Sequence, residues 1–289
     1  MVEVAIVQMK SSENKDENLK FSLEQIREAR RKKAQIICFP EFQMAFSPSS
    51  QSTKELFSIS ELVDGDFITE LRKSAKENDI HIIGTIYERS TTDSGEFTKP
   101  SNNNDSFDNQ YCVYDTAVFI NNSGILVSCY RKLHLYNALG FQESKKLLAG
   151  NKLFSPVDSP LGKLGVLVCY DLRFPELGRL LAIEGSNALV APSGWVQGEM
   201  KEDHWLTMCK ARSIENGVYL IAPNQVGNIF CGHSLIVDPF GIVILDMGTR
   251  EGVEIIDLDL GRIDLVRNDL PLLKNRRADL YNLRQMNVF

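Results

Sequence analysis

Short apolar segments rich in valine and isoleucine alternate with amphipathic segments along the first third of the chain. A short apolar run predicts a buried strand, whereas apolar positions that recur every three or four residues predict a helix with one buried face. The predicted elements are a strand at 2–9, a helix at 16–33, a strand at 35–40, a helix at 65–78 and a strand at 80–87. This β-α-β-α-β order is typical of helices that cover one face of a sheet.

The same alternation returns in the second half of the chain. The predicted elements there are a strand at 163–169, a helix at 174–184, a strand at 188–192, a helix at 200–216, and strands at 218–224 and 253–259. No low-complexity linker separates the two halves. The pattern therefore predicts one α/β domain in which two sheets pack face to face with helices outside.

Two β-hairpins interrupt the alternation. One joins strands at 113–121 and 125–130 through Asn122-Ser123-Gly124, and the other joins strands at 234–238 and 242–246. Because asparagine and glycine tolerate positive φ, the first tripeptide is typical of a tight hairpin turn. The sheets are thus expected to mix hairpins with helical crossovers.

Two segments lie outside this pattern. Residues 90–110 are polar and turn-forming throughout, which predicts a surface loop. The segment after Asp259 carries the run Leu270-Pro271-Leu272-Leu273, which is too apolar to remain free in solvent. We therefore expect a domain at 1–260 and a C-terminal tail at 261–289 that packs on the domain or on a partner subunit.

Composition and charge exclude several classes of protein. The 289 residues give a length prior of about two domains, and 43% hydrophobic with 24% charged residues is ordinary for a globular chain. A net charge of −6 without a long basic block argues against a nucleic-acid partner. No apolar run approaches a membrane span of roughly 18 residues, and the N-terminus lacks a signal-peptide pattern. A cytoplasmic location with no membrane partner is expected.

Six cysteines are scattered along the chain without a C-x-x-C pair or a matching histidine spacing. They indicate neither a zinc site nor a disulfide framework, and a chain of this length can bury a core without disulfides. We therefore expect free thiols, no metal and no cofactor. The remaining question is whether one of the thiols differs chemically from the others.

Cys169 lies at the end of a buried apolar strand and just before Pro175 and Glu176, which suit the first turn of a helix. A strand-to-helix turn presents a side chain above the sheet, beside backbone N–H groups, and the helix dipole there favours a thiolate. A buried structural cysteine is the alternative interpretation.

Glu41 and Lys132 also follow apolar strands. Alone, each would be read as a helix cap or a surface charge. Because open α/β sheets bind ligands beyond the carboxyl ends of their strands, an acid, an ammonium and a thiol at three strand ends can share one site.

Three segments of the sequence resemble the signatures of the nitrilase (carbon–nitrogen hydrolase) superfamily. They are Phe39-Pro40-Glu41-Phe42, Tyr130-Arg131-Lys132-Leu133-His134-Leu135 and Cys169-Tyr170-Asp171-Leu172-Arg173-Phe174-Pro175-Glu176. Their order and spacing also match, and the likeness spans nearly the whole chain. The resemblance implies a four-layer α-β-β-α sandwich, with a carbon–nitrogen hydrolase domain at 1–260.

The resemblance also implies a catalytic triad of Glu41, Lys132 and Cys169. Cys169 would attack an amide carbonyl while Glu41 accepts the thiol proton, and Lys132 with the backbone N–H of Tyr170 would hold the oxyanion. Ammonia would leave, and water would hydrolyse the resulting thioester. Glu143 matches a second glutamate of the family and would position Lys132 and the substrate. A helix-entry carboxylate is the alternative role of Glu143.

The residues that follow Cys169 differ from the Cys-Trp-Glu of true nitrilases and look most like the ω-amidase and deaminated-glutathione amidase branches. Both branches act on amides of carboxylate-bearing substrates. Arg173 is the expected carboxylate ligand, and an ion pair with Glu176 or another local acid is its alternative role. Trp195 is expected either to form a wall of the substrate pocket or to be a core aromatic residue.

Two other functions stay open at this point. An N-carbamoyl amine or amino-acid amidohydrolase would share the triad but release carbon dioxide together with ammonia. A binding module would keep the fold without turnover, although the intact triad argues against it. The resemblance also implies a homodimer or higher homo-oligomer, with small-molecule substrate and water as the other partners.

Overall fold

The computed structural model of the chain describes residues 1–90, 111–281 and 283. The loop predicted at 90–110 therefore lies outside the described residues, apart from Ser90. Six strands form the first sheet, in the order β14-β1-β2-β3-β4-β5. Their bounds are β1 (Val2–Gln8), β2 (Ile36–Cys38), β3 (His81–Arg89), β4 (Val113–Ile120), β5 (Leu126–Arg131) and β14 (Gly252–Leu258).

A second six-stranded sheet has the order β13-β12-β9-β8-β7-β6. Its strands are β6 (Val157–Ser159), β7 (Gly162–Val166), β8 (Ala188–Val190), β9 (Tyr219–Ala222), β12 (Leu235–Val237) and β13 (Val243–Asp246). A small hairpin, β10 (Val226–Gly227) with β11 (Phe230–Cys231), is separate from both sheets. The two sheets follow the two halves of the chain except for β14, which crosses back and pairs antiparallel with β1.

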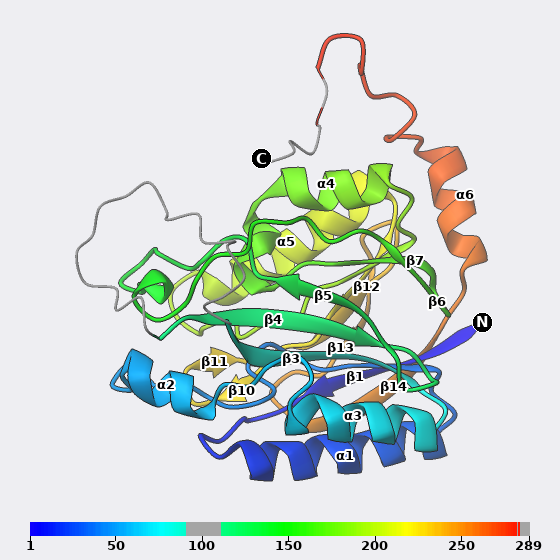
Figure 1. The fold of residues 1–289 in the computed structure, drawn as a ribbon. Helices are drawn as coiled ribbons and strands as arrows, with labels where there is room; N and C mark the ends of the chain where they lie inside the picture. The colour runs from blue at the N-terminus through cyan, green and yellow to red at the C-terminus, as the bar shows by residue number, and fades with distance from the viewer. Residues whose placement is uncertain (91–110, 282, 284–289) are drawn as a thin grey trace.

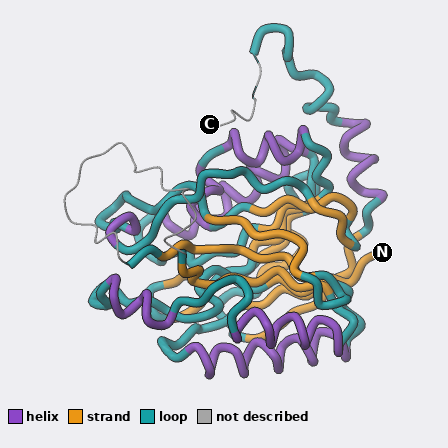
Figure 2. The backbone as a smooth tube through the Cα atoms, in the orientation of Figure 1, coloured by secondary structure: helices purple, strands orange, loops and turns teal. Residues whose placement is uncertain are grey.

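Helices cover the outer face of each sheet, so that the molecule has four layers (Figure 1; Figure 2). The helices α1 (Lys15–Arg31) and α3 (Asp66–Glu77) lie below the first sheet in this view, and α4 (Pro175–Ile183) and α5 (Lys201–Asn216) lie above the second. The predicted four-layer α-β-β-α sandwich is confirmed. The chain length suggests about two domains, but its two halves form two sheets that pack against each other over one apolar layer.

Alternation along β1 shows how the sequence builds these layers. Val4 and Ile6 belong to the apolar cluster between the sheets, whereas Ala5 and Val7 belong to the cluster under α1 and α3. Successive side chains of a strand point to opposite faces, so a strand covered on both faces must be apolar throughout. That requirement explains the continuous apolar run at the start of the chain.

One helix of the first half has no apolar periodicity that would reveal it. This is α2 (Thr53–Ile59), which begins with a capping box in which Ser52 and Glu55 satisfy each other's backbone N–H groups. The polar serine and threonine residues around it hide a seven-residue helix that buries only Leu56. Short helices held by capping are therefore missed when apolar spacing is the only signal.

The C-terminal segment begins with α6 (Gly261–Asp269), which packs on the second half of the domain. Ile263 and Val266 are buried, and the Arg267 guanidinium donates to the backbone carbonyls of Gly217 and Ser186. In Figure 1 the chain beyond α6 extends away from the sandwich. None of the helices described is long and apolar enough to cross a membrane.

Candidate active site

The structure brings Glu41, Lys132, Glu143 and Cys169 together between the two sheets. Glu41 follows β2 and Lys132 follows β5, both in the first sheet. Cys169 follows β7 of the second sheet and begins the 3₁₀ helix η2 (Cys169–Arg173), while Glu143 begins η1 (Glu143–Lys145). Glu41 and Cys169 are 128 positions apart in the sequence. They meet because the strands that precede them, one in each sheet, end on the same side of the sandwich.

Lys132 is the centre of this cluster and is fully buried. Its Nζ donates to Glu41 Oε1 at 2.7 Å and lies 3.0 and 2.9 Å from the two carboxylate oxygens of Glu143. Burial alone would lower the pKa of Lys132, but the adjacent Glu143 and Glu41 carboxylates outweigh it and raise the pKa well above its ordinary value. Lys132 is therefore a permanent cation, suited to hold an oxyanion rather than to move a proton.

Glu41 is also fully buried, yet it remains ionised. Burial favours the neutral carboxylic acid, but the charge of Lys132 and hydrogen bonds from Asp115, Lys132 and Cys169 outweigh that effect and lower the pKa of Glu41. Its second oxygen, Oε2, accepts from the Gly194 backbone N–H at 2.7 Å. An ionised carboxylate that accepts a hydrogen bond from a thiol is placed to act as a general base.

Cys169 occupies the strand-to-helix turn that the sequence predicts, with a φ of 44°. Few residues other than glycine adopt this region, and such strained turns cluster at functional sites. The Cys169 backbone N–H donates to Pro192 at 2.9 Å, which fixes the turn against the chain after β8. The Cys169 thiol lies close enough to the Glu41 carboxylate for a hydrogen bond.

The preference of the helix dipole for a thiolate at Cys169 is outweighed in the structure, in line with the expectation that Glu41 accepts a thiol proton. Burial and the charge of Glu41 raise the pKa of the Cys169 thiol well above its ordinary value, and Lys132 offsets them only in part. Glu41 is fully buried, so its negative charge is poorly screened by water. It disfavours a thiolate at Cys169 more strongly than the dipole of one helix turn favours it. Cys169 therefore rests as a thiol and needs a base at the moment of attack.

Glu143 is the one acid of the cluster with an opening to solvent, its side chain being 18% exposed. Its Oε2 accepts from the Tyr136 N–H at 2.7 Å in addition to contacting Lys132. Burial raises the pKa of Glu143, the Lys132 charge opposes that shift, and the Glu41 charge adds to it. The geometry places Glu143 as a second carboxylate that fixes the ammonium of Lys132.

Asp171 holds the turn around Cys169 and was not singled out by its sequence position. Its buried carboxylate accepts from the Tyr130 hydroxyl at 2.8 Å, from Val168 N–H at 2.9 Å and from His134 N–H at 3.0 Å. These bonds tie β5, the end of β7 and the segment after Lys132 into one unit. In the sequence, the only local indication of this role is that an acid stands two residues after Cys169.

A small pocket opens above the Cys169 sulfur. It is lined by Tyr136, Cys169, Tyr170, Arg173, Gly194, Trp195, Val196 and Lys201. Arg173 stacks its guanidinium on the Trp195 ring at 4.5 Å and lies 3.4 Å from His204 Nδ1, so Glu176 is not the partner that holds it here. Trp195 is 4% exposed and lines the pocket with one face of a ring that also belongs to the core.

Lys201 is a second cation at this pocket that the sequence pattern does not reveal. Its Nζ hydrogen-bonds the Tyr136 hydroxyl and lies 4.9 Å above the centre of the Tyr136 ring. From sequence alone, a lysine at the start of α5 is expected to be an ordinary exposed residue, because nothing local shows that the segment after β5 reaches the start of α5. Among the described residues, no group of three or more His, Cys, Asp or Glu side chains is arranged to hold a metal ion.

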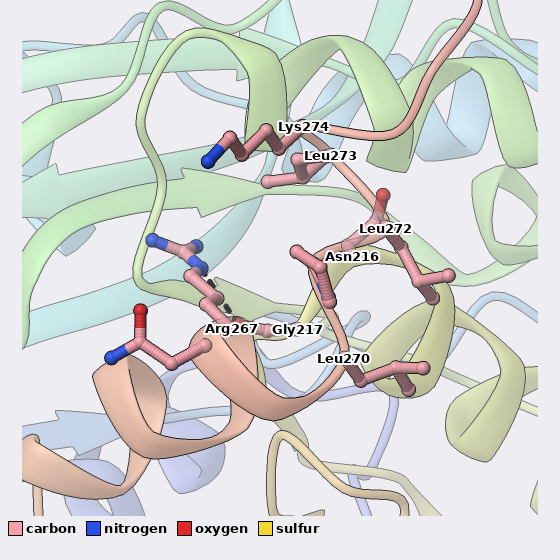
Figure 3. Close-up of a pocket in the computed structure, with 9 residues that line it drawn as sticks. Asn216, Gly217, Arg267, Leu270, Leu272, Leu273 and Lys274 are labelled. Carbon is pink, nitrogen blue, oxygen red and sulfur yellow. Dashed lines mark hydrogen bonds between the residues drawn. The ribbon is translucent and has the colours of Figure 1, made fainter.

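A larger hollow of about 280 Å³ lies elsewhere, between the end of α5 and the segment that follows α6 (Figure 3). Leu270, Leu272 and Leu273 line one side of it, and Arg267 bridges it to the Gly217 carbonyl at 3.0 Å. None of the catalytic candidates lines this hollow. The apolar wall of this hollow includes Leu270-Pro271-Leu272-Leu273, the run from which the sequence predicts that the tail packs on the domain or on a partner subunit.

Comparisons with known proteins identify the family of the chain. Residues 3–268 match the carbon–nitrogen hydrolase family. The chain is 33% identical to a deaminated glutathione amidase of Rattus norvegicus, over 96% of this chain and 83% of the relative, and 32% identical to the omega-amidase NIT2 of Mus musculus, over 97% and 96%.

A solved structure shows the same fold. The structure of Saccharomyces cerevisiae Nit3, described as a member of branch 10 of the nitrilase superfamily, superposes with a TM-score of 0.78 at 28% identity and covers 96% of both chains. The family match covers both sheets and ends within α6. The chain therefore belongs to the carbon–nitrogen hydrolase family of the nitrilase superfamily and is a hydrolase of non-peptide C–N bonds.

Proposed function

We propose that this enzyme is a cysteine-dependent amidase that releases ammonia from a small amide carrying a carboxylate group. The observation that carries the proposal is the buried contact set of Glu41, Lys132 and Cys169, which opens onto a pocket with two cations at its walls. The three side chains supply a base, an oxyanion ligand and a nucleophile. No other group is needed for acyl transfer to a thiol.

In the first half of the reaction, Cys169 Sγ attacks the amide carbon while Glu41 takes the thiol proton. The carbonyl oxygen becomes an oxyanion, which Lys132 and the Tyr170 backbone N–H stabilise. The N–H groups of the first turn of a helix have no intrahelical partner, so that of Tyr170 in η2 is free to donate. Glu41 then returns the proton to the nitrogen, the C–N bond breaks, and ammonia leaves a thioester on Cys169.

In the second half, Glu41 takes a proton from water, which attacks the thioester carbon. Lys132 and Tyr170 again hold the oxyanion. The C–S bond breaks, Glu41 gives the proton back to the sulfur, and the product leaves as a carboxylic acid that ionises. Glu41 thus acts twice as base and twice as acid, for which its ionised resting form is required.

The substrate class is argued from Arg173, Lys201 and the names of the relatives. A guanidinium can bind a carboxylate through two hydrogen bonds, and a lysine adds a point charge. Relatives that share about a third of the residues are named deaminated glutathione amidase and omega-amidase. Both names fit an amide whose far end is a carboxylate held at the pocket wall by Arg173, with Trp195 and Tyr170 beside it.

An N-carbamoyl amine or amino-acid amidohydrolase is the second candidate within the same chemistry. Ammonia and carbon dioxide should both be measured for ω-amides of 2-oxo acids, deaminated glutathione, aliphatic amides and N-carbamoyl amino acids. We expect ammonia without carbon dioxide from the carboxylate-bearing amides. Carbon dioxide in equal amount would establish the carbamoyl alternative, and no turnover of any compound would support a binding module.

Replacing Arg173 by alanine tests the carboxylate ligand. We expect kcat/KM for a carboxylate-bearing amide to fall about 10- to 100-fold, mostly through KM, because a charge-assisted bidentate contact is lost. The matched control is the same amide with the carboxylate esterified, for which the two enzymes should differ little. Equal losses on both substrates would show that Arg173 supports Trp195 instead of binding substrate.

We also propose that the enzyme is a cytoplasmic homodimer or higher homo-oligomer. Cys38, Cys129, Cys169, Cys209 and Cys231 are free thiols, which suits a reducing compartment. Ile183 at the end of α4, Leu265 on α6 and Leu280 in the tail are large exposed apolar side chains that a partner subunit could cover. Sedimentation should give a mass of at least twice 32.6 kDa, and a single species of 32.6 kDa would refute the oligomer.

A further inference from the structure

One buried carboxyl group beside the triad has no part in the reaction described above. Asp115 lies in β4, opposite Tyr87 of β3, and is 1% exposed. Its Oδ2 is 4.0 Å from Lys132 Nζ, and its backbone carbonyl accepts from the Lys132 N–H at 2.9 Å. An acid inside a strand that is buried along its whole length is costly unless it is paired.

The contacts of Asp115 require that one carboxyl group in the cluster carries a proton. The Asp115 and Glu41 carboxyl groups lie close enough to share a hydrogen bond, which two ionised carboxylates cannot form because both can only accept. Glu41 already accepts from Gly194 N–H, Lys132 and the Cys169 thiol, so its charge is satisfied. Among the described residues, Asp115 Oδ2 has no hydrogen-bond donor. The proton therefore belongs on Asp115.

The charge balance of the cluster leads to the same assignment. Asp115 faces Glu41 after β2, Tyr87 on β3, Tyr130 and Lys132 at the end of β5, and Glu143 on η1. One ammonium cannot neutralise three carboxylates of which two, Glu41 and Asp115, are buried. Burial and the charge of Glu41 raise the pKa of Asp115 well above its ordinary value, and Lys132 offsets them only in part.

We propose that Asp115 is a positioning residue that acts as a neutral carboxylic acid and donates a hydrogen bond to Glu41, which keeps the base ionised and aimed at Cys169. The predicted effect of Asp115 on the pH dependence of turnover rests on the proposed amidase function. The predicted protonation state of Asp115 does not depend on that function.

Two substitutions separate the donor from the charge. Asp115→Asn keeps a donor of the same size, so the acid limb of the kcat/KM–pH profile should stay within a few tenths of a pH unit of wild type. Asp115→Leu removes the donor. Glu41 then becomes easier to protonate, and the acid limb should move up by about one pH unit with roughly a tenfold loss of activity on that limb.

If Asp115 were ionised instead, the acid limb would move in the opposite direction. Removing a negative charge beside Glu41 would lower the pKa of Glu41, and both variants would move the acid limb to lower pH. That result, or an unmoved limb in Asp115→Leu, overturns the proposal. Thr116→Val is the matched control for loss of a buried polar side chain from β4, and its acid limb should not move.

Two measurements need no substrate. Isotope-edited infrared spectra at neutral pH should show a protonated-carboxyl band in wild type that Asp115→Asn lacks, and its presence unchanged in that variant overturns the proposal. The rate at which iodoacetamide alkylates Cys169 should show the same acid-limb shift in Asp115→Leu. If wild type hydrolyses no amide while both results appear, the proposed function fails and the role of Asp115 stands.

Discussion

Replacing Cys169 by alanine is expected to lower kcat for ammonia release by at least about 10⁴-fold, because no other described group can form the acyl-enzyme. The sulfur accepts the acyl group in the first half of the reaction, and without it Glu41 and Lys132 can only polarise bound substrate and water. The loss should therefore appear in kcat, while substrate binding changes little. Steady-state ammonia release and mass spectrometry of substrate-treated enzyme measure the two parts.

The controls for this variant are structural and chemical. Cys209 is also a fully buried free thiol, but it lies on α5 away from the triad, so Cys209→Ala should retain turnover. Wild type should gain the mass of the acyl group on the peptide that contains Cys169, and Cys169→Ala should not. Equal ammonia release from wild type and Cys169→Ala would exclude Cys169 as nucleophile.

Replacing Lys132 by methionine is expected to remove both activity and stability. The oxyanion loses its charged ligand, which costs roughly 10²- to 10³-fold in kcat by comparison with single oxyanion donors. The fold loses the cation that separates Glu41 from Glu143, and breaking a buried pair from one side costs about 3–5 kcal/mol. Both effects come from one ammonium with no exposure to water.

The stability effect of Lys132→Met has a definite pH dependence. In wild type the pKa of Glu41 is lowered, so its pairing stabilises the fold above the unfolded-state pKa and is lost as the pH falls. In the variant, the opposing ammonium is gone and burial dominates the pKa of both carboxyls and raises it, so the fold is favoured below their unfolded-state pKa and loses stability as the pH rises. The variant should lie closest to wild type near pH 5 and furthest from it near pH 8.

Urea unfolding at these two pH values measures the difference. Lys163→Met is the control, because Lys163 is 46% exposed and pairs with Asp158 at the surface, where the effect should be within about 1 kcal/mol. An equal loss of stability for Lys132→Met at both pH values would show that the lost packing of the side chain dominates, instead of its charge.

The sequence predicts the sandwich because both kinds of periodicity are strong in it. Continuous apolar strands such as β1 and amphipathic helices such as α3 each carry a local signal, and Cys169, Glu41 and Lys132 stand where strands end. The motif resemblance adds the order and spacing of the three segments. Chain positions with such local signals are those at which sequence and structure agree.

Asp115 and Lys201 show what the sequence does not contain. Their roles come from contacts between elements distant along the chain, Asp115 with the residue that follows β2 and Lys201 with Tyr136. The resting state of Cys169 is a similar case. A helix dipole can be inferred from Pro175, but the opposing charge of Glu41 acts only once the two sheets have closed.

The division of the triad between two sheets has a consequence for how this enzyme responds to change. The base and the oxyanion ligand are carried by one sheet and the sulfur by the other. Their separation is set by the thickness of the inner apolar layer, which includes Ile6 and Val166. A misplacement of about 1 Å can cost 10²-fold in rate. The turnover rate is therefore expected to be sensitive to the spacing of the two sheets. A substitution that adds or removes one methyl group in that layer, far from the substrate, should lower turnover before it unfolds the protein.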